Sequence, residues 1–182
     1  MKRTALLASL FLILTMSATV LAQQGNKTQT ASHEIEGALG GTFNFVILPF
    51  SDVTNPYFKV ASLGVVSGHV KGLGNSNLFT FHRPTDQGTV IDGRFFIVAA
   101  SGDIIRGEYE GTTGPGEDSC HLIGKAVWKI KSGTGRFEDA EGEINATAYV
   151  TIPPIPGANP PACNPLAFEW PATWVLEGKI NY

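Results

Sequence analysis

Residues 133–142 read GTGRFEDAEG, a glycine-rich stretch between two segments in which apolar and polar residues alternate. The segment before it places small or apolar residues at every second position: Leu122, Gly124, Ala126, Trp128 and Ile130. The segment after it does the same: Ile144, Ala146, Ala148, Val150 and Ile152. A period of two is typical of β-strands that bury one face. We therefore interpret the stretch as the turn of a β-hairpin in an antiparallel sheet with one buried face.

Similar alternation recurs along the chain, and the sequence predicts eight strands. Two flank the glycine-rich turn, and the others lie at about residues 34–48, 58–71, 78–83, 89–100, 103–112 and 167–182. Eight consecutive strands with short connections favour an all-β fold, an eight-stranded antiparallel up-and-down barrel, because closure removes exposed edges. A two-sheet sandwich is the alternative. Pro171 falls within the last strand, so we expect an interruption or bulge there.

The glycine-rich turn has a structural interpretation. Gly133 and Gly135 are able to adopt the positive φ that tight turns need. Phe137 is placed to fold back and close one end of the barrel, with Ala140 and Gly142 leaving it room. The stretch lacks the third glycine of a dinucleotide fingerprint and the Gly-Lys-Ser/Thr of a P-loop. A phosphate site is therefore not indicated.

Arg136 is the one cation in this turn. We expect it to pair with a nearby carboxylate at the rim, namely that of Glu138, Asp139 or Glu141.

The N-terminal region resembles an export signal. Lys2 and Arg3 precede an apolar run over residues 5–14, and small residues end at Ala22. Such a run is too short to span a bilayer and is typical of a secretory signal peptide. We predict a signal peptide over 1–22, a flexible leader over 23–32 and one barrel domain over 33–182. The protein is then secreted or periplasmic; a buried N-terminal helix is the alternative.

Cys120 and Cys163 are the two cysteines of the chain. In an exported protein the expected state is a disulfide, with free or metal-bound thiols as the alternative. The barrel count supports this pairing. Alternate connections of an up-and-down barrel share an end, so those near 49–57, 84–88, 113–119 and 153–165 form one rim. The two cysteines flank the third and fourth of these connections.

Charge and motifs exclude several function classes. The chain has 13 basic and 16 acidic residues, and removal of Lys2 and Arg3 leaves 11 against 16, a net charge of −5. No basic cluster remains, so nucleic-acid binding is not expected. The four histidines have no metal-ligand spacing, and no G-x-S-x-G motif occurs. We therefore predict no metal site and no cofactor, and the catalytic residues stay unassigned.

Aromatic residues on the apolar parity of the strands suggest a ligand pocket. If the barrel is wide enough to leave a cavity, its candidate lining residues are Phe43, Phe45, Trp128, Phe168, Trp170 and Trp174. The alternative is an ordinary filled core. The mouth of such a pocket is expected at the rim of long connections, because Phe137 closes the other end. Asn26 and Asn145 begin N-x-[ST] sequons, which matter only if the source organism glycosylates exported proteins.

The turn over 133–142 resembles the G-T-G-x-F-x-x-A-x-G turn of allene oxide cyclase and dirigent-like barrels, above all secreted bacterial members without an assigned activity. Residues 68–74 (GHVKGLG), 99–103 (AASGD) and 177–182 (EGKINY) agree with that group. The resemblance covers about residues 62–182. It implies an eight-stranded barrel, and many relatives form oligomers, so a homo-oligomer is a further expectation. The catalytic residues of those enzymes do not align with this chain.

Three functions stay open on the sequence. The leading hypothesis is a secreted, soluble, non-enzymatic barrel that binds a small apolar molecule or a protein partner. The second is a cyclase or isomerase that confines a hydrophobic substrate. The third is an eight-stranded outer-membrane barrel, which the alternating aromatic C-terminus fits. The small residues on the inward parity, among them Gly107, Ala146 and Ala148, favour a cramped interior and thus the soluble form over membrane insertion.

Overall fold

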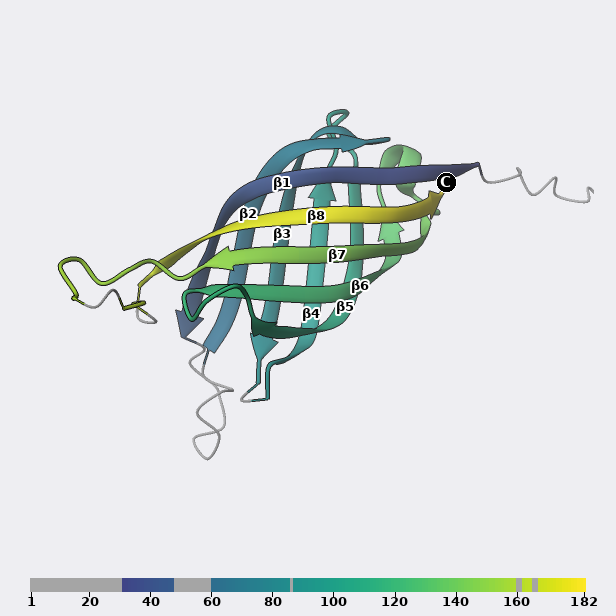
Figure 1. Ribbon diagram of the computed structural model, residues 1–182. Coiled ribbons are helices and arrows are strands. Elements are labelled where there is room, and N and C mark those ends of the chain that lie inside the picture. The colour runs from purple at the N-terminus through teal and green to yellow at the C-terminus, as the bar shows by residue number, and fades with distance from the viewer. Residues whose placement is uncertain (1–30, 48–59, 86, 160–161, 165–166) are drawn as a thin grey trace, which may run out of the picture.

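The computed structural model describes residues 31–47, 60–85, 87–159, 162–164 and 167–182. Its eight strands form a closed antiparallel barrel, in which each strand pairs with the next and the last pairs back with the first (Figure 1). The strands are β1 (Ser32–Ile47), β2 (Val60–Lys71), β3 (Gly74–Pro84), β4 (Thr89–Val98), β5 (Ile104–Pro115), β6 (His121–Gly133), β7 (Glu141–Thr151) and β8 (Glu169–Asn181). A short 3₁₀ turn, η2 (Gly135–Phe137), lies between β6 and β7. The barrel prediction is confirmed, and the sandwich is excluded. The predicted signal peptide and Asn26 lie outside the described residues.

Two local predictions about the strands were wrong. The third strand begins at Gly74, earlier than predicted, because β2 and β3 are joined by only Gly72 and Leu73. Asn75 and Asn77 are exposed while Ser76 between them is buried, so the strand is polar on both faces at its start and resembles a loop in sequence.

Pro171 causes no interruption of β8. The pairing of β8 with β1 runs without a shift from Glu169 to Asn181, and Pro171 lies opposite Thr42. On its other side, pairing with β7 begins only at Ala172, opposite Val150. A proline lacks the N–H that a strand donates, and the ladder toward β7 has not yet begun at this residue. The strand therefore tolerates Pro171.

Apolar side chains fill the middle of the barrel. Trp128 lies at the centre of an aromatic layer: its ring stacks on Phe95 at 4.5 Å between centroids and contacts Tyr109 at 5.5 Å and Trp174 at 5.1 Å. Trp128, Trp174 and Ile144 are all buried, which confirms that the apolar parity of the strands points inward. Buried aliphatic side chains make up much of the remaining core: Ile35, Leu39, Leu78, Ile97, Ile105, Ile144, Leu176 and Ile180.

Phe137 closes the end of the barrel that carries η2 and the C-terminus (Figure 1). Its side chain is 0% exposed, and its ring meets that of Tyr182 edge to face at 4.7 Å. Ala140 is buried beside it. Gly135 has a φ of 56°, as predicted for the turn. Gly133 does not take a positive φ; glycine is needed there because a Cβ would lie 2.2 Å from the carbonyl oxygen of Phe137.

Arg136 does not pair with the carboxylates of its own turn. Its guanidinium lies over the Phe137 ring at 4.5 Å and donates a hydrogen bond to the carbonyl oxygen of Gly72 at 3.2 Å. Its Nε lies 4.0 Å from Oδ2 of Asp103. Arg136 therefore connects three turns at the closed end, and its partners come from neighbouring connections that the sequence does not place beside it.

The outer wall of the barrel is rich in charge. Exposed charged residues occupy the outward positions of the strands: Arg94, Arg106, Glu108, Glu110, Lys125, Lys129, Lys131, Glu143, Glu177 and Lys179. One apolar area interrupts this pattern on β3 and β4, where the rings of Phe79 and Phe96 stack at 4.6 Å and Phe96 is 43% exposed. No helix in the described part of the chain has the length and apolar character needed to cross a bilayer.

Candidate functional site

The barrel is hollow at the end opposite Phe137. A cavity of about 400 Å³ lies at the rim of the β3–β4, β5–β6 and β7–β8 connections. Most of the surface that lines it is apolar, and its apolar residues are Phe43, Pro84, Val90, Leu122, Ala126, Ala148, Val150, Trp170 and Trp174. The position agrees with the prediction that a pocket would open at the rim of long connections.

The aromatic layer is the floor of this cavity. Phe43, Tyr109 and Trp174 line the cavity, whereas Trp128 and Phe95 lie in the same layer without lining it. The ring of Phe43 contacts that of Trp174 at 5.8 Å. Small side chains on β6 and β7, among them Ala126 and Ala148, leave open the space above this floor. The interior is thus filled below the aromatic layer and empty above it.

One wall of the cavity carries polar groups. His82 on β3 and Tyr109 on β5 form a hydrogen bond, with 2.8 Å between the His82 Nδ1 and the Tyr109 hydroxyl oxygen. Ser62 lies directly opposite His82 in the β2–β3 pairing, is buried and lines the cavity. Thr80 is buried nearby on β3. We call His82, Tyr109 and Ser62 the polar wall.

A β-bulge in the strand between them brings His82 and Tyr109 together. Phe81 pairs with Arg94 and Arg83 with Ile91, so the extra residue on β4 falls opposite His82. Asp92, in the bulge, has a φ of 52°, the positive φ of a non-glycine residue, and its carboxylate pairs with the Arg83 guanidinium. Bulges and left-handed non-glycine residues are both frequent at functional sites. Their strain persists only where the surrounding fold stabilises it.

Gly93 follows Asp92 and leaves the space that the Tyr109 ring occupies. A Cβ at residue 93 would lie 2.7 Å from two carbon atoms of that ring and 2.3 Å from the Tyr109 carbonyl oxygen. Without a side chain on β4 at this point, Tyr109 reaches past β4 to His82 on β3. The bulge and the glycine therefore have one joint effect, which is to place the phenol against the imidazole.

Burial shifts the pKa of both partners away from neutrality. Loss of solvation lowers the pKa of His82 from 6.5 to about 4, because the imidazolium is the charged form. Burial also raises the pKa of Tyr109 well above its usual value, because the phenolate is its charged form. Near pH 7 the pair is thus a neutral imidazole bonded to a neutral phenol.

This shift predicts a stability loss in mild acid. The unfolded chain protonates His82 near pH 6.5 and the folded protein only near pH 4. Between pH 6.5 and pH 4 the unfolded chain binds more protons than the folded protein. The free energy of unfolding therefore decreases as the pH is lowered, and His82 accounts for about 3 kcal/mol of this decrease. Urea unfolding of the wild type and of His82→Gln, measured at pH 7 and at pH 4, tests this expectation.

The glutamine variant should lose about 3 kcal/mol less than the wild type over the same interval. Carboxylates such as Asp118, whose pKa is lowered by the His121 side chain, contribute equally in both proteins and cancel. An identical fall in both proteins would show that His82 is not held neutral by the fold.

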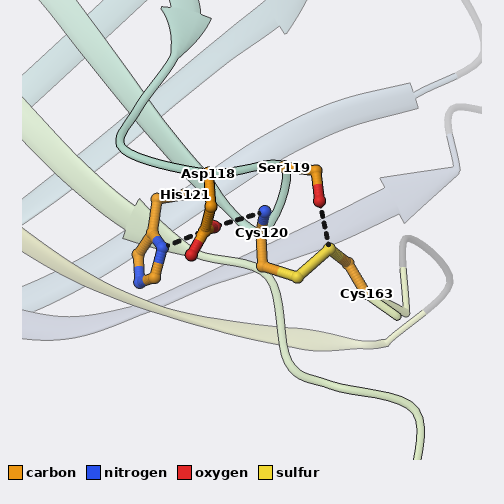
Figure 2. Close-up of a disulfide and its surroundings, with 5 residues drawn as sticks. All are labelled: Asp118, Ser119, Cys120, His121 and Cys163. Atoms are coloured by element: carbon orange, nitrogen blue, oxygen red, sulfur yellow. Dashed lines mark hydrogen bonds and ion pairs between the residues drawn. A yellow bond between two sulfur atoms is a disulfide. The ribbon is translucent and has the colours of Figure 1, made fainter. Parts of the chain in front are cut away.

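The disulfide ties together two connections at the open rim. Cys120 and Cys163 are bonded, with their Cα atoms 5.3 Å apart, as predicted. Figure 2 shows the bond beside Asp118, whose carboxylate accepts hydrogen bonds from the Cys120 backbone at 2.7 Å and the His121 ring at 2.8 Å. The β5–β6 turn is thus held by Asp118, and the β7–β8 connection is fastened to it.

The predicted pocket residues fall into distinct groups. Phe43, Trp170 and Trp174 line the cavity. Trp128 is buried in the aromatic layer and does not line the cavity. Phe168 differs from expectation: it precedes β8, is 69% exposed and does not line the cavity, because alternation is lost outside the paired part of the strand. The side chain of Phe45 lies outside the described part of the structure.

Sequence reasoning missed the polar wall. In the sequence, His82 is one of four histidines without metal-ligand spacing, and Tyr109 is one residue of the strand expected at 103–112. Inward parity was the available signal, since Thr80, His82 and Tyr109 fall on the positions of their strands that face the core. In the described residues, no three of the histidine, cysteine, aspartate and glutamate side chains gather as a metal site would need.

The chain matches no protein-family model, no curated protein and no solved structure. The likeness of its turn to the allene oxide cyclase and dirigent-like barrels therefore stays a prediction.

Proposed function

We propose that this protein binds a small, largely apolar molecule in the cavity at the open end of its barrel. The observation that carries the proposal is the cavity itself, about 400 Å³ with a floor and sides of aromatic and aliphatic groups. Ligand pockets typically enclose about 300–1,000 Å³ and combine an apolar lining with a few placed polar groups. A hollow next to a tightly filled core costs packing energy, which a ligand would recover.

The charged outer wall supports a barrel that works in water. Charges such as Arg94, Lys129 and Glu177 occupy outward strand positions around the barrel. The outer band of a membrane barrel is apolar, and charges at its middle are strongly unfavourable. This pattern favours the proposal over the outer-membrane alternative.

The enzyme alternative has weaker support. A general acid or base works best with a pKa near the working pH. His82, with its pKa lowered to about 4, is a weak base, and Tyr109, with its pKa raised, is a weak acid. The pair is better suited to hydrogen bonding than to proton transfer, and this favours binding over catalysis.

Binding can be tested with the neutral apolar dye N-phenyl-1-naphthylamine in detergent-free buffer. Trp170 and Trp174 line the cavity, so bound dye should quench their fluorescence. Val150→Phe places a ring in the cavity and should weaken binding about tenfold or more, a change of about 1.4 kcal/mol. Val127→Phe adds the same ring on the outer wall, where Val127 is exposed, and should bind like the wild type.

No dye binding by the wild type, together with no retained small molecule in native mass spectrometry of the protein from its producing cells, would overturn the proposal. A protein that stays dispersed only in detergent would favour the outer-membrane alternative instead.

A further inference from the structure

The polar wall has unused hydrogen-bonding capacity toward the cavity. His82 bonds to Tyr109 through Nδ1, and its Nε2 has no hydrogen-bond partner within the described chain. If the phenol donates to Nδ1, Nε2 carries a hydrogen to donate. If Nδ1 donates instead, Nε2 is an acceptor and the phenol hydrogen is free. In either tautomer the pair therefore offers at least one further hydrogen bond.

Ser62 adds a second open group at the same place. It lies opposite His82 in the β2–β3 pairing and lines the cavity, and its hydroxyl has no hydrogen-bond partner among the described residues. Polar groups taken out of water are costly when unpaired. His82, Ser62 and Tyr109 thus form one compact hydrogen-bonding point on a lining whose surface is mostly apolar, to which Thr85, Thr112 and Thr113 add further hydroxyls.

The charge of the lining limits what can bind there. Of the residues known to line the cavity in the described structure, Lys125 alone is charged near pH 7. Lys125 is exposed and lies on β6, whereas Ser62 and His82 lie on β2 and β3, and it pairs with Thr112 of β5, three residues along the strand from Tyr109. A carboxylate or phosphate bound at the polar wall would lose its water without gaining a cation.

We infer that the ligand is an uncharged amphiphile, an apolar body with one hydroxyl or carbonyl group that bonds to His82 and Ser62. This inference rests on the proposed function and specifies the chemical class of its ligand. The apolar body occupies the space above Trp174 and Phe43, and the polar group fixes its orientation. An unsubstituted hydrocarbon would leave the polar wall unpaired, and an anion would be rejected.

Three probes of one shape test the inference: naphthalene, 2-naphthol and 2-naphthoate, each measured by displacement of N-phenyl-1-naphthylamine at pH 7. We expect 2-naphthol to bind about fivefold more tightly than naphthalene, the size of one net hydrogen bond. The anionic 2-naphthoate should bind most weakly. His82→Phe should abolish the preference for 2-naphthol, so that the ratio of the naphthalene and 2-naphthol affinities approaches one. His69→Phe, which alters an exposed histidine of β2, is the matched control and should keep the preference.

If His82→Phe fails to fold, Ser62→Ala removes the other group that bonds to the ligand and should reduce the same preference. Equal affinity for naphthalene and 2-naphthol, or tightest binding of 2-naphthoate, would overturn the inference and leave the proposed function standing. Failure of the dye and of all three probes to bind would overturn the proposed function itself.

Discussion

Phe137→Ala should lower the free energy of unfolding by about 3–5 kcal/mol, the range for removal of a fully buried ring. Phe137 is 0% exposed, meets the Tyr182 ring edge to face and lies beneath the Arg136 guanidinium. Its removal opens a hole at the closed end of the barrel, where the neighbouring strands are fixed by pairing and cannot collapse. Urea unfolding followed by tryptophan fluorescence measures the loss.

Glu138→Ala is the control for this experiment, because Glu138 is exposed on the same turn. It should change stability by no more than about 0.5 kcal/mol. A loss of less than about 1 kcal/mol in Phe137→Ala would show that the plug contributes little and that the sheet alone holds that end closed. The dye-binding cavity lies at the other end, so any Phe137→Ala protein that folds should bind the dye as the wild type does.

Alternation along the strands was sufficient to predict the barrel. The parity of Trp128 and Ile144 indicated which side faces inward, and the order of connections placed Cys120 and Cys163 on one rim. These features depend on the period of the alternation and on the number of strands, and both can be read from a single sequence. The burial of Phe137 was also predictable, because a large apolar side chain in an otherwise polar turn is expected to pack into the core.

The polar wall could not be predicted in the same way. Its geometry depends on the bulge at Asp92, and a non-glycine residue with positive φ leaves no clear mark in sequence. Without the bulge, His82 and Tyr109 are merely inward residues of two strands that are not neighbours. The partners of Arg136 were missed for a related reason, since Asp103 and Gly72 approach it only through the closure of the barrel end.

Whether the interior is filled or hollow was equally beyond the sequence. The same inward parity supplies Trp128, which fills the middle, and Ala148, which lines the cavity. The difference follows from how the rings of the aromatic layer lie against each other, and that depends on register between strands distant in the chain. Small residues on the inward parity indicated a cramped interior, whereas at the open end they leave space above the floor.

Loss of the disulfide should lower the free energy of unfolding by about 4 kcal/mol in the chain-entropy model, given the separation of 43 residues between the two cysteines. The test is a Cys120→Ser, Cys163→Ser double variant, compared with the wild type by urea unfolding with and without reductant. The wild type in reductant should approach the double variant, and reductant should leave the double variant unchanged.

The expected loss acts mainly through the unfolded chain, because the folded rim keeps other contacts. The Ile152 backbone donates to the Cys120 carbonyl oxygen at 2.7 Å, and the Asn164 backbone donates to that of Pro153 at 2.7 Å. These bonds hold the start of the β7–β8 connection to the β5–β6 turn and fold the connection on itself without the sulfur atoms. Dye binding by the folded double variant should therefore stay close to that of the wild type. A loss of less than about 1 kcal/mol would contradict the entropic account, and loss of dye binding at full stability would show instead that the disulfide shapes the mouth of the cavity.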